Sequence, residues 1–390
     1  MVGYVPFLFL LLVAALILHV GFLYTAVYLL TAIYVLSRLW VGQMRINMRL
    51  TQHLNDRLFP GDKLNVEVTV KNEGWLPVPW VEIHHSFPTE LTSPLPTEFF
   101  TLSSYAVYHQ RFTFPVRRRG FYTIGPLDMR FGDVFGIVPR QRVREAVRSI
   151  IVYPIIVPIE KLGLPTRSPL AALPASTALF EDTSRVMGVR DYQPGDSPRQ
   201  IHWSASAHSG TMLVKRYQPA IARETLICLD MRRDDYSRER YYDAIEMAIT
   251  VAASIANHII VDERQTAGLA VQAIDPLRDR RQVSQFYLPP RGERAALMHI
   301  LDVLARIQSL DTPFLDNLHR DRLHLKFGAT LVIVTGIETR ELYDRLIPLV
   351  HAGVAIALVL VQPGGAPRLK VPPPRGVALY RILDTNALIL

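Results

Sequence analysis

The chain has 390 residues, and its 43 Lys and Arg against 35 Asp and Glu give a formal net charge of +8. Hydrophobic residues make up 49%, which excludes a largely disordered chain, and the length suggests about two or three domains. The single cysteine, Cys228, excludes an internal disulfide framework and a cysteine-rich zinc module. The basic excess is small once the arginines of the first fifty residues are set aside, so no nucleic-acid partner is expected.

The N-terminal segment is apolar. Residues 1–37 contain no Asp, Glu, Lys or Arg, and an almost unbroken apolar run extends from Tyr4 to Trp40. A membrane-spanning helix needs roughly 20 apolar residues, so this run is nearly long enough for two. We predict a transmembrane helical hairpin over residues 1–41, with helices at Tyr4–His19 and Gly21–Leu39. One long tilted helix, a cleavable signal peptide and a buried hairpin are the alternatives.

The charges around this segment predict its orientation. Arg38, Arg45 and Arg49 follow the apolar run, and no charged side chain precedes it. The positive-inside rule then places the remainder of the chain in the cytoplasm, anchored to the inner (cytoplasmic) membrane. The lipid bilayer is therefore the first expected partner.

Residues 50–155 have the pattern of a β-rich domain. Leu64–Val70 alternates apolar and polar residues, which is typical of a half-buried strand, and Asn72-Glu73-Gly74 provides a turn. We expect an all-β antiparallel sandwich. Its other predicted strands are Val81–Ile83, Tyr105–Phe114, Phe121–Ile124 and Val147–Tyr153.

Two features of this domain could bind ligands. The run Arg117–Arg119 fits a solvated turn or, in a domain held at a membrane, a patch for lipid headgroups. His84 and His85 are adjacent on a predicted strand, so their side chains point to opposite faces, which does not favour a shared metal.

Residues 156–219 combine a proline-rich linker with a polar signature, Gly188–Trp203. Pro194-Gly195 predicts a type II turn, after which Asp196 can pair with Arg190 or Arg199. The segment could clamp two domains together or bind a partner; a Ser204-His202-Asp196 catalytic set is less favoured, because these residues are crowded and no nucleophile elbow is visible. The candidate binding or inter-domain residues are Arg190, Tyr192, Gly195, Asp196, Arg199 and Trp203.

The pattern Gly188-x-Arg190-x-Tyr192-x-x-Gly195-Asp196-x-x-Arg199-x-Ile201-x-Trp203 resembles the hallmark of the domain of unknown function 58 family. Phe131-Gly132-Asp133-Val134-Phe135-Gly136 and Arg119-Gly120-x-Tyr122-x-Ile124-Gly125-Pro126 are also similar to that family. The resemblance implies membrane anchoring, a von Willebrand factor A-like domain and a MoxR-type AAA+ ATPase as partner, with other envelope proteins.

The residues themselves predict an α/β domain at 220–370, followed by a tail at 371–390. Apolar strands alternate with helices, which indicates a mainly parallel sheet. The expected strands are Thr225–Asp230, Ala267–Ile274, Val283–Leu288, Thr330–Thr335 and Val354–Val361, with a last short one at Val377–Ile382, and the expected helices are Tyr241–Ile259, Arg294–Gln308 and Thr339–His351. Cys228 lies inside the first strand and is expected to be a buried apolar residue.

Asp230 ends the first of these strands, where parallel sheets bind ligands. The von Willebrand resemblance implies a Mg²⁺ site of the form Asp-x-Ser-x-Ser there, with a later threonine and an acid. Here Arg232 and Asp234 replace the serines, Thr312 is a candidate threonine, and Thr335-Gly336 stands where the acid is expected. We therefore expect no cofactor, and an Arg232–Asp230 or Arg233–Asp234 ion pair instead.

These features lead to one main functional expectation, a non-enzymatic, membrane-anchored scaffold or adaptor with a protein-binding α/β domain. A Mg²⁺-dependent adhesion module and a hydrolase that uses Asp196 and His202 are the alternatives. The biological process and the oligomeric state do not follow from the sequence.

Overall fold

The computed structural model describes residues 4–92, 95–162, 164, 181–193, 196–219, 224–237, 240–278, 282–312, 323–325, 328–363 and 372–383. The chain divides into two compact units, Met1–Pro154 and Ile155–Leu390. Each unit is described separately.

The first unit begins with a pair of apolar helices, α1 (Tyr4–Leu18) and α2 (Gly21–Asn47). His19 has a φ of 55°, which allows the tight turn predicted between them. Tyr4 stacks on Tyr34 and donates its hydroxyl to the Leu30 carbonyl at 3.0 Å, so the two helices lie antiparallel. Among the described residues, α2 and the segment Tyr241–Asp262 are long and apolar enough to cross a membrane.

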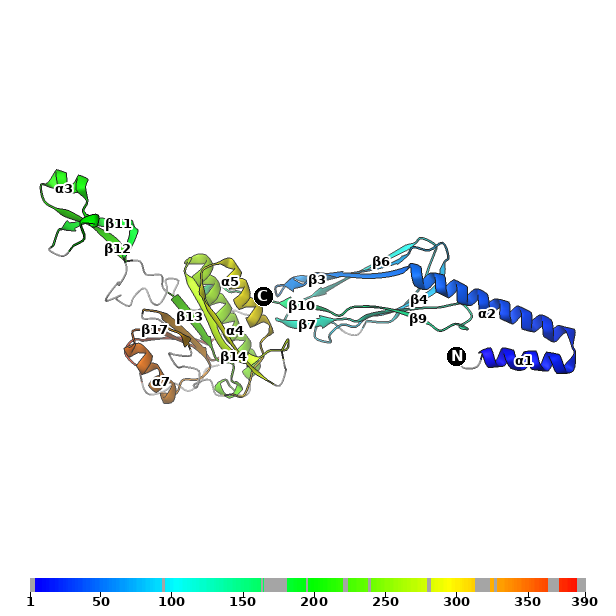
Figure 1. Cartoon of the computed structure of the whole chain (residues 1–390). Coiled ribbons are helices and arrows are strands. Elements are labelled where there is room, and N and C mark those ends of the chain that lie inside the picture. Colours follow the sequence, from blue (N-terminus) through cyan, green and yellow to red (C-terminus); the bar gives the residue numbers. More distant parts are fainter. Residues whose placement is uncertain are drawn as a thin grey trace. The chain divides into compact units, whose positions relative to one another are not determined.

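Helix α2 is longer than predicted and ends inside the β-rich part of this unit (Figure 1). Val41 and Met44, which lie beyond the predicted end at Leu39, are buried in the core of the strands. Trp40 donates its ring N–H to the Pro77 carbonyl at 3.0 Å. The last turns of α2 are therefore fixed by tertiary packing, a contribution that the apolar run does not reveal.

The strands of the first unit form three sheets with a common apolar core. Their orders are β1-β3-β6, β2-β10-β7 and β5-β4-β8-β9. All neighbouring strands run antiparallel except β2 and β10, which are parallel, so the prediction of an entirely antiparallel arrangement was wrong at that pair. The bounds are β1 (Met48–Leu54), β2 (Arg57–Leu58), β3 (Lys63–Asn72), β4 (Val78–His84), β5 (Glu98–Leu102), β6 (Val107–Pro115), β7 (Gly120–Ile124), β8 (Leu127–Phe131), β9 (Gln141–Glu145) and β10 (Arg148–Val152).

The second unit contains a six-stranded sheet of order β15-β14-β13-β16-β17-β18. Five strands are parallel and the edge strand β15 is antiparallel to β14. Numbered within the sheet, this is the order 3-2-1-4-5-6 of doubly wound folds, whose switch point lies between the first and fourth strands. The bounds are β13 (Glu224–Leu229), β14 (Thr266–Ile274), β15 (Val283–Arg291), β16 (Thr330–Thr335), β17 (Ala355–Val361) and β18 (Val377–Ile382).

Helices cover both faces of this sheet (Figure 1). Helix α7 (Arg340–His351) packs with Leu226 and Cys228, whereas α4 (Tyr241–Asn257) and α5 (Arg294–Arg306) contact each other and the strands. Most residues of α4 are buried, and a π-helical turn, η4 (His258–Asp262), continues it. The apolar segment Tyr241–Asp262 is thus a core helix of the unit.

Two predicted boundaries differ from the structure. The strand β18, placed in a tail at 371–390, pairs with β17 as the sixth strand of the sheet. Part of the predicted linker also belongs to the second unit, because the backbone N–H of Val157 donates to Ser254 Oγ at 2.9 Å and a 3-10 turn, η1 (Ile159–Leu162), contacts α4.

Candidate functional site

The polar signature forms a β-hairpin with a short helix. Strand β11 (Glu181–Asp191) pairs with β12 (Leu213–Pro219), and the chain between them contains a 3-10 turn, η2 (Pro198–Gln200), and α3 (Trp203–Ser209). The strand therefore starts inside the predicted linker. Gly195, with its predicted turn, and the Arg199 side chain lie outside the described residues.

Asp196 is held by Arg190, one of the two partners that the sequence left open. Both guanidinium NH groups donate to the two carboxylate oxygens at 2.7 Å, and the backbone N–H of Gln193 donates to Oδ2 at 2.9 Å. The Arg190 guanidinium, followed by the Gln193 N–H, lowers the pKa of Asp196 to about 2. A bidentate pair restricts orientation as well as distance, so it fixes the Asp196 side chain relative to Arg190 at the end of β11.

Two aromatic rings of the signature are accessible. Trp203 is 67% exposed at the start of α3, and Tyr192, whose N–H donates to the Met212 carbonyl, is 37% exposed. His202 caps α3 by accepting the N–H of Ala205 at its Nδ1, with Ser204 Oγ 3.2 Å away. Asp196 and His202 therefore have different partners, and the hydrogen bonds of the described residues do not assemble the Asp-His pair of a catalytic triad.

Asp230 lies at the carboxyl end of β13, next to the switch point of the sheet, and is fully buried. Its Oδ1 accepts the backbone N–H of Arg232 at 2.9 Å, and its Oδ2 accepts the Thr335 hydroxyl at 2.7 Å. The hydroxyl of Tyr236 donates to the Asp230 carbonyl at 2.7 Å. Asp235 is a further buried carboxyl neighbour.

Burial, and then the charge of Asp235, raise the pKa of Asp230 well above its ordinary value. Burial also raises the pKa of Asp235. Two close carboxyl groups in a low-dielectric site do not both ionise readily. The pair can therefore retain a proton at a pH where exposed carboxyls are ionised.

The predicted ion pairs around Asp230 were wrong. The Arg232 guanidinium lies 3.4 Å from Asp234 and 3.6 Å from Asp235, and only its backbone N–H reaches Asp230. Arg233 donates from Nε to Ser309 Oγ at 3.0 Å. Arg232 thus pairs with the exposed Asp234 and the buried Asp235, and Arg233 bonds to a serine instead of an acid.

These residues do not fit a Mg²⁺ site. Both Asp230 oxygens already accept hydrogen bonds, and Asp234 extends to solvent beside Arg232. Thr312 is exposed and, among the described residues, does not bond to Asp230. An acid is also sterically excluded at Gly336, because a Cβ there would collide with the Asp235 carbonyl and the Tyr236 ring. Magnesium requires several free oxygen ligands, which this arrangement does not offer.

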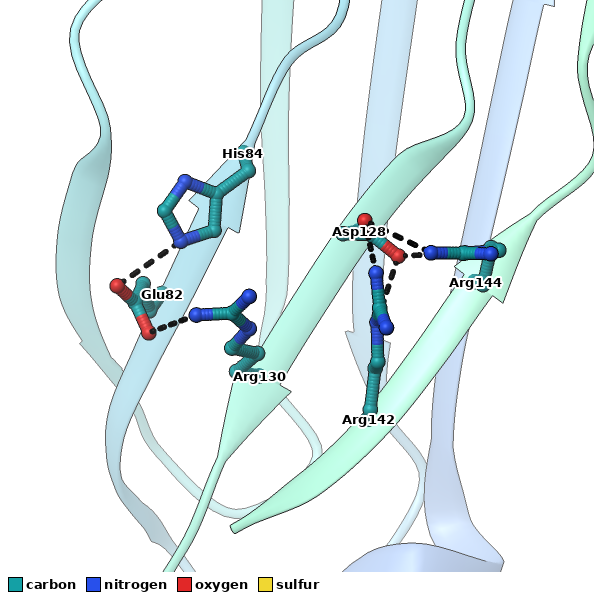
Figure 2. Close-up of polar contacts among 6 residues, drawn as sticks. All are labelled: Glu82, His84, Asp128, Arg130, Arg142 and Arg144. Carbon is teal, nitrogen blue, oxygen red and sulfur yellow. Dashed lines mark hydrogen bonds and ion pairs between the residues drawn. The ribbon is translucent and has the colours of Figure 1, made fainter.

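A second polar cluster, which the sequence did not indicate, covers the outer face of the sheet β5-β4-β8-β9 (Figure 2). Glu82 is buried and accepts from His84 Nε2 at 2.9 Å, with Arg130 at 3.9 Å. Arg142 and Arg144 each donate from Nε to Asp128 at 2.9 Å. Hydrogen bonds from Arg142 are the main cause that lowers the pKa of Asp128 to about 2.

This cluster forms because alternate residues of adjacent antiparallel strands share one face. The register pairs Glu82 with Arg130 and Asp128 with Arg144, so opposite charges lie directly across from one another. The charged residues at alternate positions of β8 and β9 could have indicated that these strands have one polar face. Which strands pair with each other could not be predicted from the sequence. These ion pairs link neighbouring strands of the sheet, although Glu82 Oε2 is buried without a hydrogen bond among the described residues and has only Arg130 at 3.9 Å.

The fold and these sites define a chain with an apolar helix pair, a β-rich unit and a doubly wound α/β unit. Residues 188–324 match the model of the family described as Protein of unknown function DUF58. The match begins at the polar signature and extends past the Asp230 loop and α5.

Among known proteins, the chain is similar to "Uncharacterized protein YeaD" of Bacillus subtilis (strain 168), with 24% identity over 228 residues. The alignment covers 55% of this chain, which spans about half (53%) of that relative's length.

Two solved structures are weakly similar. The CARDB domain of a Pyrococcus furiosus protein in complex with di-metal ions has 17% identity and a TM-score of 0.20, covering 27% of this chain and 94% of that one. The complex of Zinc 2-glycoprotein and Prolactin inducible protein from human seminal plasma has 15% identity and a TM-score of 0.22, with the same coverage. Likenesses at these scores carry no argument about fold or function.

Proposed function

We propose that the chain is a non-enzymatic, membrane-anchored adaptor whose second unit, a von Willebrand factor A-like domain, binds a protein partner. The observation that carries the proposal is the signature hairpin, which joins the bidentate Arg190–Asp196 pair to an exposed tryptophan, Trp203, seven residues further on. Trp, Tyr and Arg are enriched at the centres of protein interfaces, and a fixed loop loses less entropy on binding. A MoxR-type AAA+ ATPase is the proposed partner, as the family resemblance implies.

The anchor in this proposal is the helix pair α1–α2. Phe22, Leu29 and Leu36 expose 76%, 63% and 63% of their surface along α2, which suits a helix surrounded by lipid. Arg38 and Arg45 follow on the same helix and Arg49 lies in β1, so the positive-inside rule favours cytoplasmic units at the inner membrane.

Two alternative functions have less support. An adhesion module would need Mg²⁺ ligands that the Asp230 loop does not offer. A hydrolase would need Asp196 to orient His202, yet Arg190 holds both oxygens of Asp196.

The binding proposal is tested with the full chain, purified from solubilised membranes, and a purified MoxR-type ATPase. We expect binding that Trp203→Ala weakens by about 2 kcal/mol, as interface tryptophans commonly do. Trp75→Ala is the matched control, because Trp75 is 65% exposed in the other unit and should leave the affinity unchanged.

The ion pair gives a second variant set. Asp196→Ala should weaken the binding, and the charge-exchanged variant Arg190→Asp with Asp196→Arg should recover part of it. No binding by the wild type, or equal binding by the wild type, Trp203→Ala and Asp196→Ala, would contradict the proposal.

A further inference from the structure

The loop between β8 and β9 presents two large apolar side chains to solvent. Val134 is 72% exposed and Phe135 is 67% exposed. They belong to the motif Phe131–Gly136, and neither the Asp230 site nor the signature hairpin uses them.

The loop is held in a fixed shape. Asp133 is buried and its two carboxylate oxygens accept the backbone N–H groups of Ile137 and Val138 at 3.0 and 3.1 Å. Trp80 donates its ring N–H to the Asp133 carbonyl at 3.0 Å. A Cβ at Gly132 would lie 2.8 Å from this ring, so the motif glycine leaves room for it. Hydrogen bonds and packing therefore hold the loop in a conformation that exposes Val134 and Phe135.

The loop lies against the apolar helix α2. An open recess of about 210 Å³ is lined by Ile33, Leu36, Ser37 and Trp40 of α2, by Pro79, and by Asp133, Val134 and Phe135 of the loop. Ile33 to Trp40 covers roughly 10 Å of the helix axis. The two exposed side chains thus continue the exposed apolar surface of α2.

Polar and aromatic side chains lie next to the recess on the helix pair. Arg38 donates to the Tyr34 hydroxyl at 3.0 Å, and Tyr34 stacks on Tyr4 of α1. Arg140, the last residue of the loop, lies over the Trp80 ring. Tyr and Arg at the end of an apolar helix are typical of the bilayer interface, where cations meet lipid phosphates.

We propose that the β8–β9 loop inserts Val134 and Phe135 into the same bilayer leaflet as the Arg38 end of α2, and so orients the β-rich unit on the membrane surface. The proposal rests on the membrane anchoring proposed above. A lipid acyl chain occupies the recess between the loop and α2. Val134 and Phe135 would lie about 5–10 Å deep at the boundary between headgroups and acyl chains, as interfacial apolar side chains do.

The same geometry separates the loop from the predicted headgroup patch. Arg117–Arg119 follow Pro115, which pairs with Lys63 at the start of β3, whereas Asn72 at its other end pairs with Met48 next to α2. A ten-residue strand is roughly 30 Å long. The arginine run therefore lies at the end of the unit away from α2, so the loop is the lipid contact that we propose.

The test attaches an environment-sensitive fluorophore to single introduced cysteines of the full chain in phosphatidylcholine–phosphatidylglycerol vesicles. Quenching by lipids that carry spin labels at shallow and at deep acyl-chain positions is measured for Phe135→Cys and Leu29→Cys. Val147→Cys is the control, because Val147 is 55% exposed beyond the opposite end of β8 and β9. We expect quenching at positions 135 and 29, and none at 147.

The outcomes separate the two proposals. Quenching at position 29 without position 135 would overturn the loop insertion and leave the anchor intact. Absence of quenching at both positions would overturn the anchor and the insertion together. Equal quenching at positions 135 and 147 would also overturn the insertion, since it would show contact without the specificity of the loop.

Discussion

Cys228 illustrates how burial determines the chemistry of one residue. It lies inside β13 with 2% of its surface exposed, and burial followed by the charge of Asp230 raises its pKa to about 12. A thiol reacts as its thiolate. Cys228 is therefore unreactive for two reasons, because reagents cannot reach it and because it stays protonated.

We therefore predict that Cys228 does not react with maleimide at pH 7.5 in the folded protein and reacts fully after denaturation. Mass spectrometry before and after addition of urea measures the modification. Rapid stoichiometric labelling of the native chain would show that β13 is not buried as described.

His85 predicts a pH dependence in the β-rich unit. Both of its ring nitrogens lack hydrogen-bond partners among the described residues, and the ring packs edge-on against Phe112. Burial lowers its pKa, so the unfolded chain binds the proton more readily than the folded one. This contribution to stability is complete above the unfolded pKa of about 6.5 and decreases as the pH falls through it.

The expected result is that His85→Phe loses less stability than the wild type between pH 7.5 and pH 5. Urea denaturation at each pH provides the free energies of unfolding. His53→Phe is the control, because His53 is exposed on β1 and the wild-type slope should remain. An unchanged slope in His85→Phe would refute the assignment.

The Asp230 loop predicts the response to magnesium. Since its oxygens are engaged by Arg232 and Thr335, millimolar Mg²⁺ is not expected to raise the Tm. Differential scanning fluorimetry of the wild type and Asp230→Asn provides the comparison. A Tm that rises with Mg²⁺ in the wild type alone would restore the adhesion-module alternative.

At the scale of elements, the turn after β16 is tightly packed. A Cβ at Gly336 would meet the Asp235 carbonyl and the Tyr236 ring, both of which are fixed around Asp230. Gly336→Ala should therefore lower the free energy of unfolding by about 1–3 kcal/mol, the usual effect of overpacking a core. Gly188→Ala is a suitable control, because no atom lies within 4 Å of a Cβ built there. Equal stability of both variants would contradict this packing.

Strands β16 and β17 were predictable because each is a short apolar run between turn residues. Strands β8 and β9 were missed because each has only five residues, and β9 contains a single apolar residue, Val143. The end of α2 was also missed, because Val41 and Met44 extend the helix through contacts with strands distant in sequence.

In the candidate sites, too, some contacts could be predicted from the sequence and others could not. The sequence predicted that Asp196 pairs with Arg190 or Arg199, both close to it in the chain, and the structure shows the pair with Arg190. The partners of Asp230 were not predictable, since Thr335 reaches it only through the pairing of β13 with β16. Polar contacts between residues close in the chain can therefore be predicted from the sequence. Contacts between residues of different strands depend on the strand order of the sheet.

At the scale of the whole molecule, the proposed topology has both folded units on the cytoplasmic side of a membrane that holds α1 and α2. Its central claim is tested by labelling Ala146→Cys and Ser237→Cys, one exposed position in each unit, with a membrane-impermeant maleimide. The unreactive Cys228 leaves each introduced thiol as the reactive one. The labelling is measured on chain recovered in membranes after an alkaline carbonate wash, from intact cells and from cells with a permeabilised inner membrane. Both positions should be labelled only after permeabilisation. Labelling in intact cells would refute the cytoplasmic orientation, and loss of the chain from the washed membranes would refute the anchor.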